Sequence, residues 1–332
     1  MKLGPLSVIL VTVAARAAAA AAPELGLPLA CRPGEDCWPI RYVDHDPGPG
    51  ERDYRCGEQT GDGHDGTDVA IRDLAAMAEG VPVLTVAPGV VRAVRDGEPD
   101  QNVVERGEAA LQGRDCGNGV RIDHGEGWIS QVCHLRRGSV RVLEGDRVER
   151  GDPLGLVGLS GATSFPHVHL TVEQEGRTVD PFLGGADPED CGASAEPLWR
   201  ADVLEDLTYE PVVLHAAGFA GAAPEADDLR RGWHRGTELP VTSPALVFWV
   251  DGFWVRAGDR LSFEVVRPDG SVLVDDESVI DDDHRRYFAF AGRRRPDGPW
   301  PAGRYRGRVV LERESASGEP VRTSLAREVV LR

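Results

Sequence analysis

The chain has 332 residues and a formal net charge of −18, from 37 basic and 55 acidic side chains. A chain of this length is expected to hold two domains of ordinary size. Its acidic balance argues against nucleic acid and anionic membrane surfaces as partners, because both repel a negatively charged protein. Composition alone says nothing more about function, so the motifs must decide it.

Residues 1–22 have the pattern of a secretory signal peptide. Lys2 supplies a positive charge, Leu3–Ala15 an apolar core, and Ala17–Ala22 small residues suited to cleavage. The apolar run is shorter than the roughly 20 residues that span a bilayer, and no later segment is long and apolar enough. We therefore expect an exported protein of the periplasm or cell envelope, without a stable membrane span after signal removal.

Residues 23–55 are rich in Pro, Gly and Asp, and we predict an irregular lead-in there. All six cysteines lie after the predicted signal, and an even number in an exported protein indicates disulfides. Within the lead-in, Cys31 and Cys37 are expected to pair locally.

The other four cysteines are more widely spaced. Cys116 and Cys133 flank a hairpin whose turn is predicted near Gly125, so folding there places them opposite each other, within reach of a cross-strand bridge. Cys56 would then pair with Cys191 by elimination.

Residues 56–186 are predicted to form an antiparallel β domain with one short helix near Asp73–Ala78, because short β-rich runs alternate with turns. The expected strands are Thr67–Ile71, Val81–Val86, Ala87–Val91, Gly119–Asp123, Trp128–Leu135, Val140–Leu143, Leu154–Val157 and Val168–Val172.

Three fragments of this domain fit one metal site: His64 to Asp68, Cys133-His134-Leu135, and His167-Val168-His169. Zinc takes His nitrogen and Asp oxygen at about 2 Å, and catalytic sites commonly use three protein ligands. His64, Asp68 and His169 form such a set. Residues two apart on a strand point to one face, so His167 would lie beside the metal. His134 and His167 then remain free for proton transfer.

These fragments resemble the lysostaphin and LytM family of zinc endopeptidases, which cleave peptide cross-links in peptidoglycan. The resemblance covers roughly residues 55–183 and includes the order H-x-x-x-D, H-L, H-x-H. It implies one zinc per chain, held by His64, Asp68 and His169, with His134 and His167 as catalytic residues that are not ligands. The chain departs from many relatives at Val132, where they have Tyr, and no Tyr lies between Tyr54 and His64.

The resemblance implies an exported zinc metalloendopeptidase that acts on peptidoglycan stem peptides. Zinc would polarise the scissile carbonyl and lower the pKa of the attacking water. His134 and His167 would act as acid and base, with their two roles left open. Two alternatives stay open: a non-catalytic activator of other wall hydrolases, which would work with an envelope protein partner, and a plain envelope-binding protein.

Residues 187–197 read as a linker, and residues 198–332 as an immunoglobulin-like β-sandwich without a metal-ligand cluster. A chain shortened to end near Pro197 is expected to fold and bind zinc. Core packing explains most of the aromatic positions Phe248, Trp249, Phe253 and Trp254, because alternation buries one of each adjacent pair. Trp249 or Trp254, if exposed, could still dock on the polymer or on the first domain. The expected strands are Ala245–Val250, Leu261–Val266, Ser271–Val274, Arg304–Glu312 and Leu325–Leu331.

Overall fold

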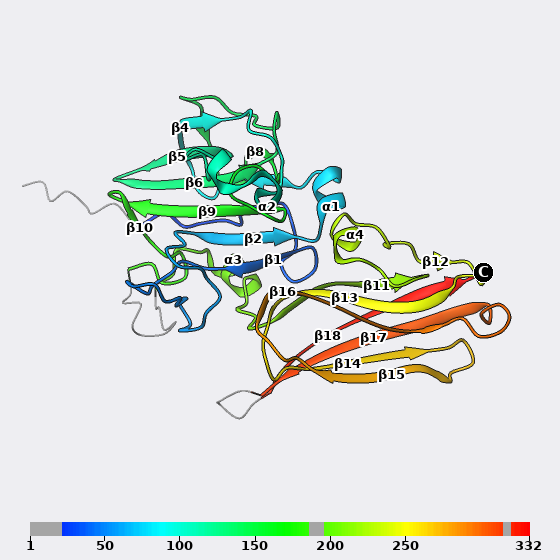
Figure 1. Ribbon diagram of the computed structural model, residues 1–332. Coiled ribbons are helices and arrows are strands. Elements are labelled where there is room, and N and C mark those ends of the chain that lie inside the picture. The colour runs from blue at the N-terminus through cyan, green and yellow to red at the C-terminus, as the bar shows by residue number, and fades with distance from the viewer. Residues whose placement is uncertain (1–21, 186–195, 315–319) are drawn as a thin grey trace, which may run out of the picture.

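The structure is a computed structural model that describes residues 22–185, 196–314 and 320–332. The predicted signal up to residue 21 and Cys191, with its predicted bridge to Cys56, lie outside the described residues. Within the described ranges, no helix is long and apolar enough to cross a membrane. Figure 1 shows two β-rich units side by side, the first containing β1 to β10 and the second β11 to β18.

The first unit is built on a sheet with the strand order β1-β2-β9-β6-β5-β4-β7, in which β10 also pairs with β9. Every pairing in it is antiparallel, so the predicted fold class is confirmed. The strands are β1 (Cys37–Arg41), β2 (Thr67–Ile71), β4 (Gly89–Arg95), β5 (Asn118–Gly125), β6 (Trp128–Leu135), β7 (Arg147–Val148), β9 (His167–Gln174) and β10 (Arg177–Thr178).

Smaller elements surround this sheet. They are the strand pair β3 (Pro82–Leu84) and β8 (Pro153–Leu156), the helices α1 (Leu74–Glu79), α2 (Val103–Arg106) and α3 (Ala201–Asp206), and the 3₁₀ turn η1 (Glu108–Ala110). The helix predicted near Asp73–Ala78 is α1, and the Asp73 side chain caps it by accepting a hydrogen bond from the backbone N–H of Ala76.

Two local predictions are wrong. The lead-in is not irregular throughout, because Cys37–Arg41 forms β1 at the edge of the sheet. Pro39 masked this strand in the sequence, and an edge strand tolerates proline because one side of its backbone needs no partner. Val140–Leu143 is not a strand. The backbone N–H groups of Val140 and Leu143 donate to the carboxylates of Asp96 and Asp146 instead of to a ladder.

The second unit has two sheets, ordered β11-β13-β16 and β12-β18-β17-β14-β15. Both sheets contribute side chains to one hydrophobic cluster, in which Phe248 and Tyr305 are fully buried. The immunoglobulin-like assignment stays a prediction. The elements are β11 (Val213–Ala220), α4 (Ala226–Arg230), β12 (Glu238–Leu239), β13 (Ala245–Val255), β14 (Arg260–Val266), β15 (Val272–Val279), β16 (His284–Arg294), β17 (Gly303–Arg313) and β18 (Val321–Leu331).

The segment that follows the predicted linker packs on the first unit. Leu198, Trp199 and Leu207 are buried in the same hydrophobic cluster as the strands of the first sheet. The ring of Tyr209 stacks on Tyr42, with their centroids 5.4 Å apart. A boundary at residue 198 would cut this core, so we place the change of unit after Glu210.

A small buried cluster joins the two units. Trp38 and Ile40 on β1 pack there with Val213, Phe253 and Trp254 from β11 and β13. The indole N–H of Trp254 donates a hydrogen bond to the backbone carbonyl of Ile40. Trp254 therefore docks on the first unit, one of the two positions left open for it, while Trp249 is buried in the second unit.

Candidate metal centre

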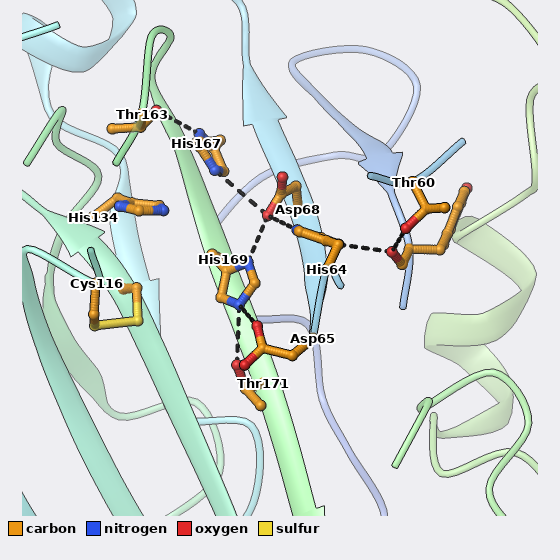
Figure 2. A network of polar contacts seen from close by, with 12 residues as sticks. Thr60, His64, Asp65, Asp68, Cys116, His134, Thr163, His167, His169 and Thr171 are labelled. Atoms are coloured by element: carbon orange, nitrogen blue, oxygen red, sulfur yellow. Dashed lines mark hydrogen bonds and ion pairs between the residues drawn. A yellow bond between two sulfur atoms is a disulfide. The ribbon is translucent and has the colours of Figure 1, made fainter. Parts of the chain in front are cut away.

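His64, Asp68 and His169 come together on one face of the first sheet, as predicted (Figure 2). Asp68 on β2 lies directly opposite His169 on β9, so their side chains share a face. The Asp68 Oδ1 atom lies 3.2 Å from His64 Nε2 and 2.9 Å from His169 Nδ1. One ligand atom from each residue lies within 4.8 Å of the others, a spacing that a single cation can bridge.

In both His64 and His169, the ring nitrogen that does not face Asp68 has a second partner. His64 Nδ1 donates to the backbone carbonyl of Tyr42 at 2.7 Å. His169 Nε2 lies 3.1 Å from an oxygen of Asp65 and 3.0 Å from Thr171 Oγ1. Such contacts fix the ring orientation and leave the other nitrogen for a metal.

Sequence reasoning missed Asp65 and Thr171 as partners of His169. Thr171 carried a usable signal, because it lies two residues after His169 on a strand and so shares its face. Asp65 lies on the loop before β2, where no periodicity predicts its direction.

The electrostatics of the group suit a bound cation. Burial would raise the pKa of Asp68, but the charges of His64 and His167 hold it well below its ordinary value. Burial would lower the pKa of His169, but hydrogen bonds to Asp65 and Asp68 raise it to about 9. A metal ion that binds here replaces the proton on His169. Two imidazoles and one carboxylate form a donor set that zinc accepts, so these residues fit the metal.

His134 lies beside this group at the end of β6. Its Nδ1 atom donates to the backbone carbonyl of Ser160 at 2.8 Å, which leaves Nε2 without its proton in the neutral ring. Burial, together with the charges of His167 and His169, lowers the pKa of His134 well below its ordinary value. The ring is therefore neutral near pH 7 and can accept a proton.

The backbone of His134 has a φ of 65°, which is unusual for a residue with a side chain. Two contacts to the neighbouring strand hold it there. The Cys116–Cys133 disulfide, predicted from the hairpin, forms next to it, and the His134 N–H donates to the carbonyl of Cys116 at 2.8 Å.

The remaining disulfide predictions have different outcomes. The local Cys31–Cys37 bridge forms as predicted. Cys56 is disulfide-bonded, and its predicted pairing with Cys191 involves a residue outside the described ranges.

His167 is the second histidine beside the metal group, with its ring centroid 4.7 Å from that of His134. Its Nε2 atom lies 3.4 Å from Asp68 Oδ1, and its Nδ1 atom lies 3.0 Å from the carbonyl of Phe165 and 3.1 Å from Thr163 Oγ1. The Phe165 ring stacks on the His167 ring at 4.5 Å. All five predicted site residues therefore line one cleft, with a volume of about 590 Å³.

Other histidines make structural contacts away from the cleft. His45 Nε2 lies 2.8 Å from an Asp180 oxygen. His124 Nδ1 donates to the carbonyl of Pro88, and its Nε2 lies 2.8 Å from Ser130 Oγ. Both histidines therefore hold contacts within the first unit and do not line the cleft.

Comparison with known proteins places this site in a family. Residues 62–181 match the sequence model of Peptidase family M23. Cell division protein DipM of Caulobacter vibrioides is 28% identical over 171 residues, which cover 49% of this chain and 23% of that protein. Peptidoglycan DD-endopeptidase ShyA of Vibrio cholerae is 32% identical over 117 residues, which cover 35% of this chain and 22% of that protein.

The chain thus spans less than a quarter of the length of these two relatives. Among solved structures, a variant of the catalytic domain of the prophage-encoded M23 protein EnpA from Enterococcus faecalis has 23% identity and a TM-score of 0.33. The alignment covers 50% of this chain and 98% of that domain. The segment that carries the His64, Asp68 and His169 group belongs to peptidase family M23.

Proposed function

We propose that this protein is an exported, zinc-dependent endopeptidase that hydrolyses peptide bonds in peptidoglycan cross-links. The observation that carries the proposal is the placement of five residues in one cleft of the M23 segment: a three-residue ligand group and two histidines beside it. A non-catalytic activator has no need for the two extra histidines, so their presence favours catalysis. ShyA, by its name a peptidoglycan endopeptidase, supports the substrate class.

The metal would be held by His64, Asp68 and His169. When bound, zinc supplies a Lewis acid that polarises the scissile carbonyl and makes water a better nucleophile. Asp65 and Thr171 orient the His169 ring, and the carbonyl of Tyr42 orients that of His64. This support keeps the ligands in position during turnover.

Proton transfer falls to the two other histidines. His134 is neutral because burial lowers its pKa and its Nδ1 proton is donated to the Ser160 carbonyl, so its unprotonated Nε2 can accept a proton from the attacking water. His167 lies beside the metal group, with its Nε2 atom 3.4 Å from Asp68 Oδ1. His167 is then the group that donates a proton to the leaving amine or a hydrogen bond to the oxyanion.

Export is part of the proposal. Two disulfides form among the described residues, and such bridges persist in oxidising compartments. The signal pattern at residues 1–22 supports the same location.

The decisive experiment incubates the purified mature protein with sacculi, with a chelator and with added zinc. Mass analysis of the supernatant should find peptides released by hydrolysis of cross-links, lost with the chelator and restored by zinc. Asp68→Asn should release none, whereas Asp62→Asn, which changes an exposed acid nearby, should match the wild type. Binding to sacculi with no release under any condition would refute catalysis and favour an envelope-binding protein.

A further inference from the structure

Four charged residues line the cleft outside the metal group: Asp65, which contacts His169, and Arg41, Glu108 and Asp115, which do not contact that group. Arg41 is the cleft's one lining arginine, and no lysine lines it. Within the described part of the chain, the side chains of Arg41, Glu108 and Asp115 form no hydrogen bond or ion pair with other protein groups. Their charges are therefore available to a ligand.

The order of strands places these charges on opposite sides of the metal group. Arg41 lies on β1 and is paired in register with Asp68 on β2, so its side chain starts on the same sheet face. On the other side, Asp115 precedes Cys116, whose disulfide ties it to Cys133 on β6. Since the strand order is β1-β2-β9-β6, the metal ligands on β2 and β9 lie between the cation and the anions.

Glu108 is a second acidic residue of the cleft near Asp115. It begins η1, and both residues lie in the connection between α2 and β5. The positive side has a separate origin. Arg41 lies in the lead-in, outside the segment at residues 62–181 that matches the family. This polarity is therefore built partly from residues that the family match does not include.

We propose that the cleft binds a zwitterionic peptide, with a free carboxylate on the Arg41 guanidinium and a free amine beside Glu108 and Asp115. The bond to be cut then lies between the two charges, over the metal group. A guanidinium offers a carboxylate two parallel N–H donors. In a chain with net charge −18, a local cation is also what offsets the repulsion of an anionic group. This inference rests on the proposed function and names the chemistry of its substrate.

The test uses four versions of one synthetic cross-linked stem-peptide dimer, with one carboxylate free or amidated and one amine free or acetylated, on opposite sides of the cross-link. Dissociation constants are measured by calorimetry with the full mature chain after chelation, so that no peptide is cut during the measurement. Cleavage rates are measured separately with zinc. Melting temperature and bound zinc are recorded for every variant as checks on folding.

For the wild type, amidation or acetylation should each weaken binding about tenfold, the loss expected for one charge-assisted hydrogen bond. Arg41→Gln should remove the preference for the free carboxylate and keep the preference for the free amine. Asp115→Asn should reduce the preference for the free amine and keep the preference for the free carboxylate. Arg41→Lys should retain part of the carboxylate preference, because it keeps the charge and loses the paired donors.

Arg260→Gln is the matched control, because Arg260 lies on β14 of the second unit, pairs with Glu277 and does not line the cleft, and it should keep both preferences. Wild-type dissociation constants within twofold for all four peptides would overturn the inference, as would a full carboxylate preference in Arg41→Gln. If the preferences hold but no peptide is cut with zinc, the proposed function fails and the binding inference stands. If all four peptides are cut and bound equally, the function stands and the inference fails.

Discussion

Each of the two units buries a histidine, and the comparison of His134 with His215 shows what distinguishes the candidate site. Burial lowers the pKa of both, for His215 to about 4. The Nδ1 atom of His134 is held by a carbonyl and its ring lines the cleft. His215 Nδ1 has no hydrogen-bond partner among the described residues, and its ring packs against Trp38 and Phe253 between the units. Burial is therefore common to both histidines. His134 differs in that a carbonyl holds its Nδ1 atom and its ring lines the cleft.

The two units nevertheless touch close to the site. The Phe165 ring, which stacks on His167, also contacts Phe253 of the second unit at 5.5 Å. The Arg286 guanidinium lies 6.0 Å from the Phe165 ring and 5.5 Å from the Phe253 ring. The five candidate site residues lie in the first unit, and the second unit supports one wall of the cleft.

The largest expected effect comes from ending the chain before the last residues of the first core. A chain that ends at Pro197 lacks Leu198, Trp199 and Leu207 of the first core. Loss of a large buried side chain costs about 2–5 kcal/mol, against a total stability of about 5–15 kcal/mol. We expect this chain not to fold, whereas one that ends at Glu210 should fold and bind zinc. Thermal melts followed by circular dichroism check this, and equal melting of the two would restore the boundary at residue 198.

Loss of a metal ligand should abolish activity without unfolding the chain. His64→Ala, Asp68→Ala and His169→Ala should each lose most of the bound zinc, because three ligands hold it. Elemental analysis of the purified variants measures this. His215→Ala is the control, since it removes a buried histidine from the second unit, and it should keep its zinc. Wild-type zinc content in all three ligand variants would show that the assignment is wrong.

Removal of either free histidine should lower the rate and leave the metal in place. His134→Ala and His167→Ala should each slow peptide release by about 10²-fold or more, the usual worth of a positioned acid or base. Rates and zinc content are measured on the same preparations. Loss of zinc from His167→Ala would mean that His167 and His169 have exchanged roles, and near-normal rates in both variants would exclude the mechanism.

A smaller effect is expected when Asp65, which contacts the metal ligand His169, is changed. Asp65→Asn removes the charge beside His169 Nε2. It should weaken zinc binding about tenfold, the smallest loss of metal affinity usual when a residue that hydrogen-bonds a metal ligand is changed. The pKa of His169 in the metal-free protein should also fall below its value of about 9, which NMR titration can follow. Asp62→Asn is the matched acid, and it should change neither quantity. An unchanged zinc affinity in Asp65→Asn would show that Thr171 alone orients the ring.

The smallest effect tests the contact between the units. Phe253→Ala leaves the Phe165 ring less supported over His167, and kcat should fall about threefold with KM and zinc content unchanged, since a misplaced catalytic group slows the reaction. Phe290→Ala removes an exposed phenylalanine of the same unit and should have no effect. Equal kcat values for the two variants would show that the contact between the units does not affect catalysis.

The sequence predicted those parts of the structure that local patterns encode. The spacing of His167 and His169 indicated a shared strand face, and the cysteines around Gly125 indicated the bridge of Cys116 with Cys133; the structure has both. Short sequence motifs contain all five site residues, so the sequence alone predicts them, and their chemical roles stay proposals.

The features that local sequence patterns do not predict depend on contacts between residues far apart in the chain. Arg41 reaches the cleft because β1 pairs with β2, and Pro39 concealed that strand. Trp199 joins the first core across the predicted linker, and no local pattern assigns a tryptophan to one of two cores. The stacking of Phe165 between His167 and Phe253 likewise follows only from the packed structure.

The disulfide between Cys116 and Cys133 ties the geometry of the cleft to the redox state of the surroundings. It closes a loop with a sequence separation of 17, and a bridge over a loop of that size stabilises a folded chain by about 3 kcal/mol in the loop-entropy model. In a reducing compartment the chain would lack this restraint next to His134, and the hydrogen bond from the His134 N–H to the Cys116 carbonyl would still link the segment after Asp115 to β6. Oxidation of Cys116 and Cys133 therefore adds stability at the backbone that positions His134 beside the candidate metal group.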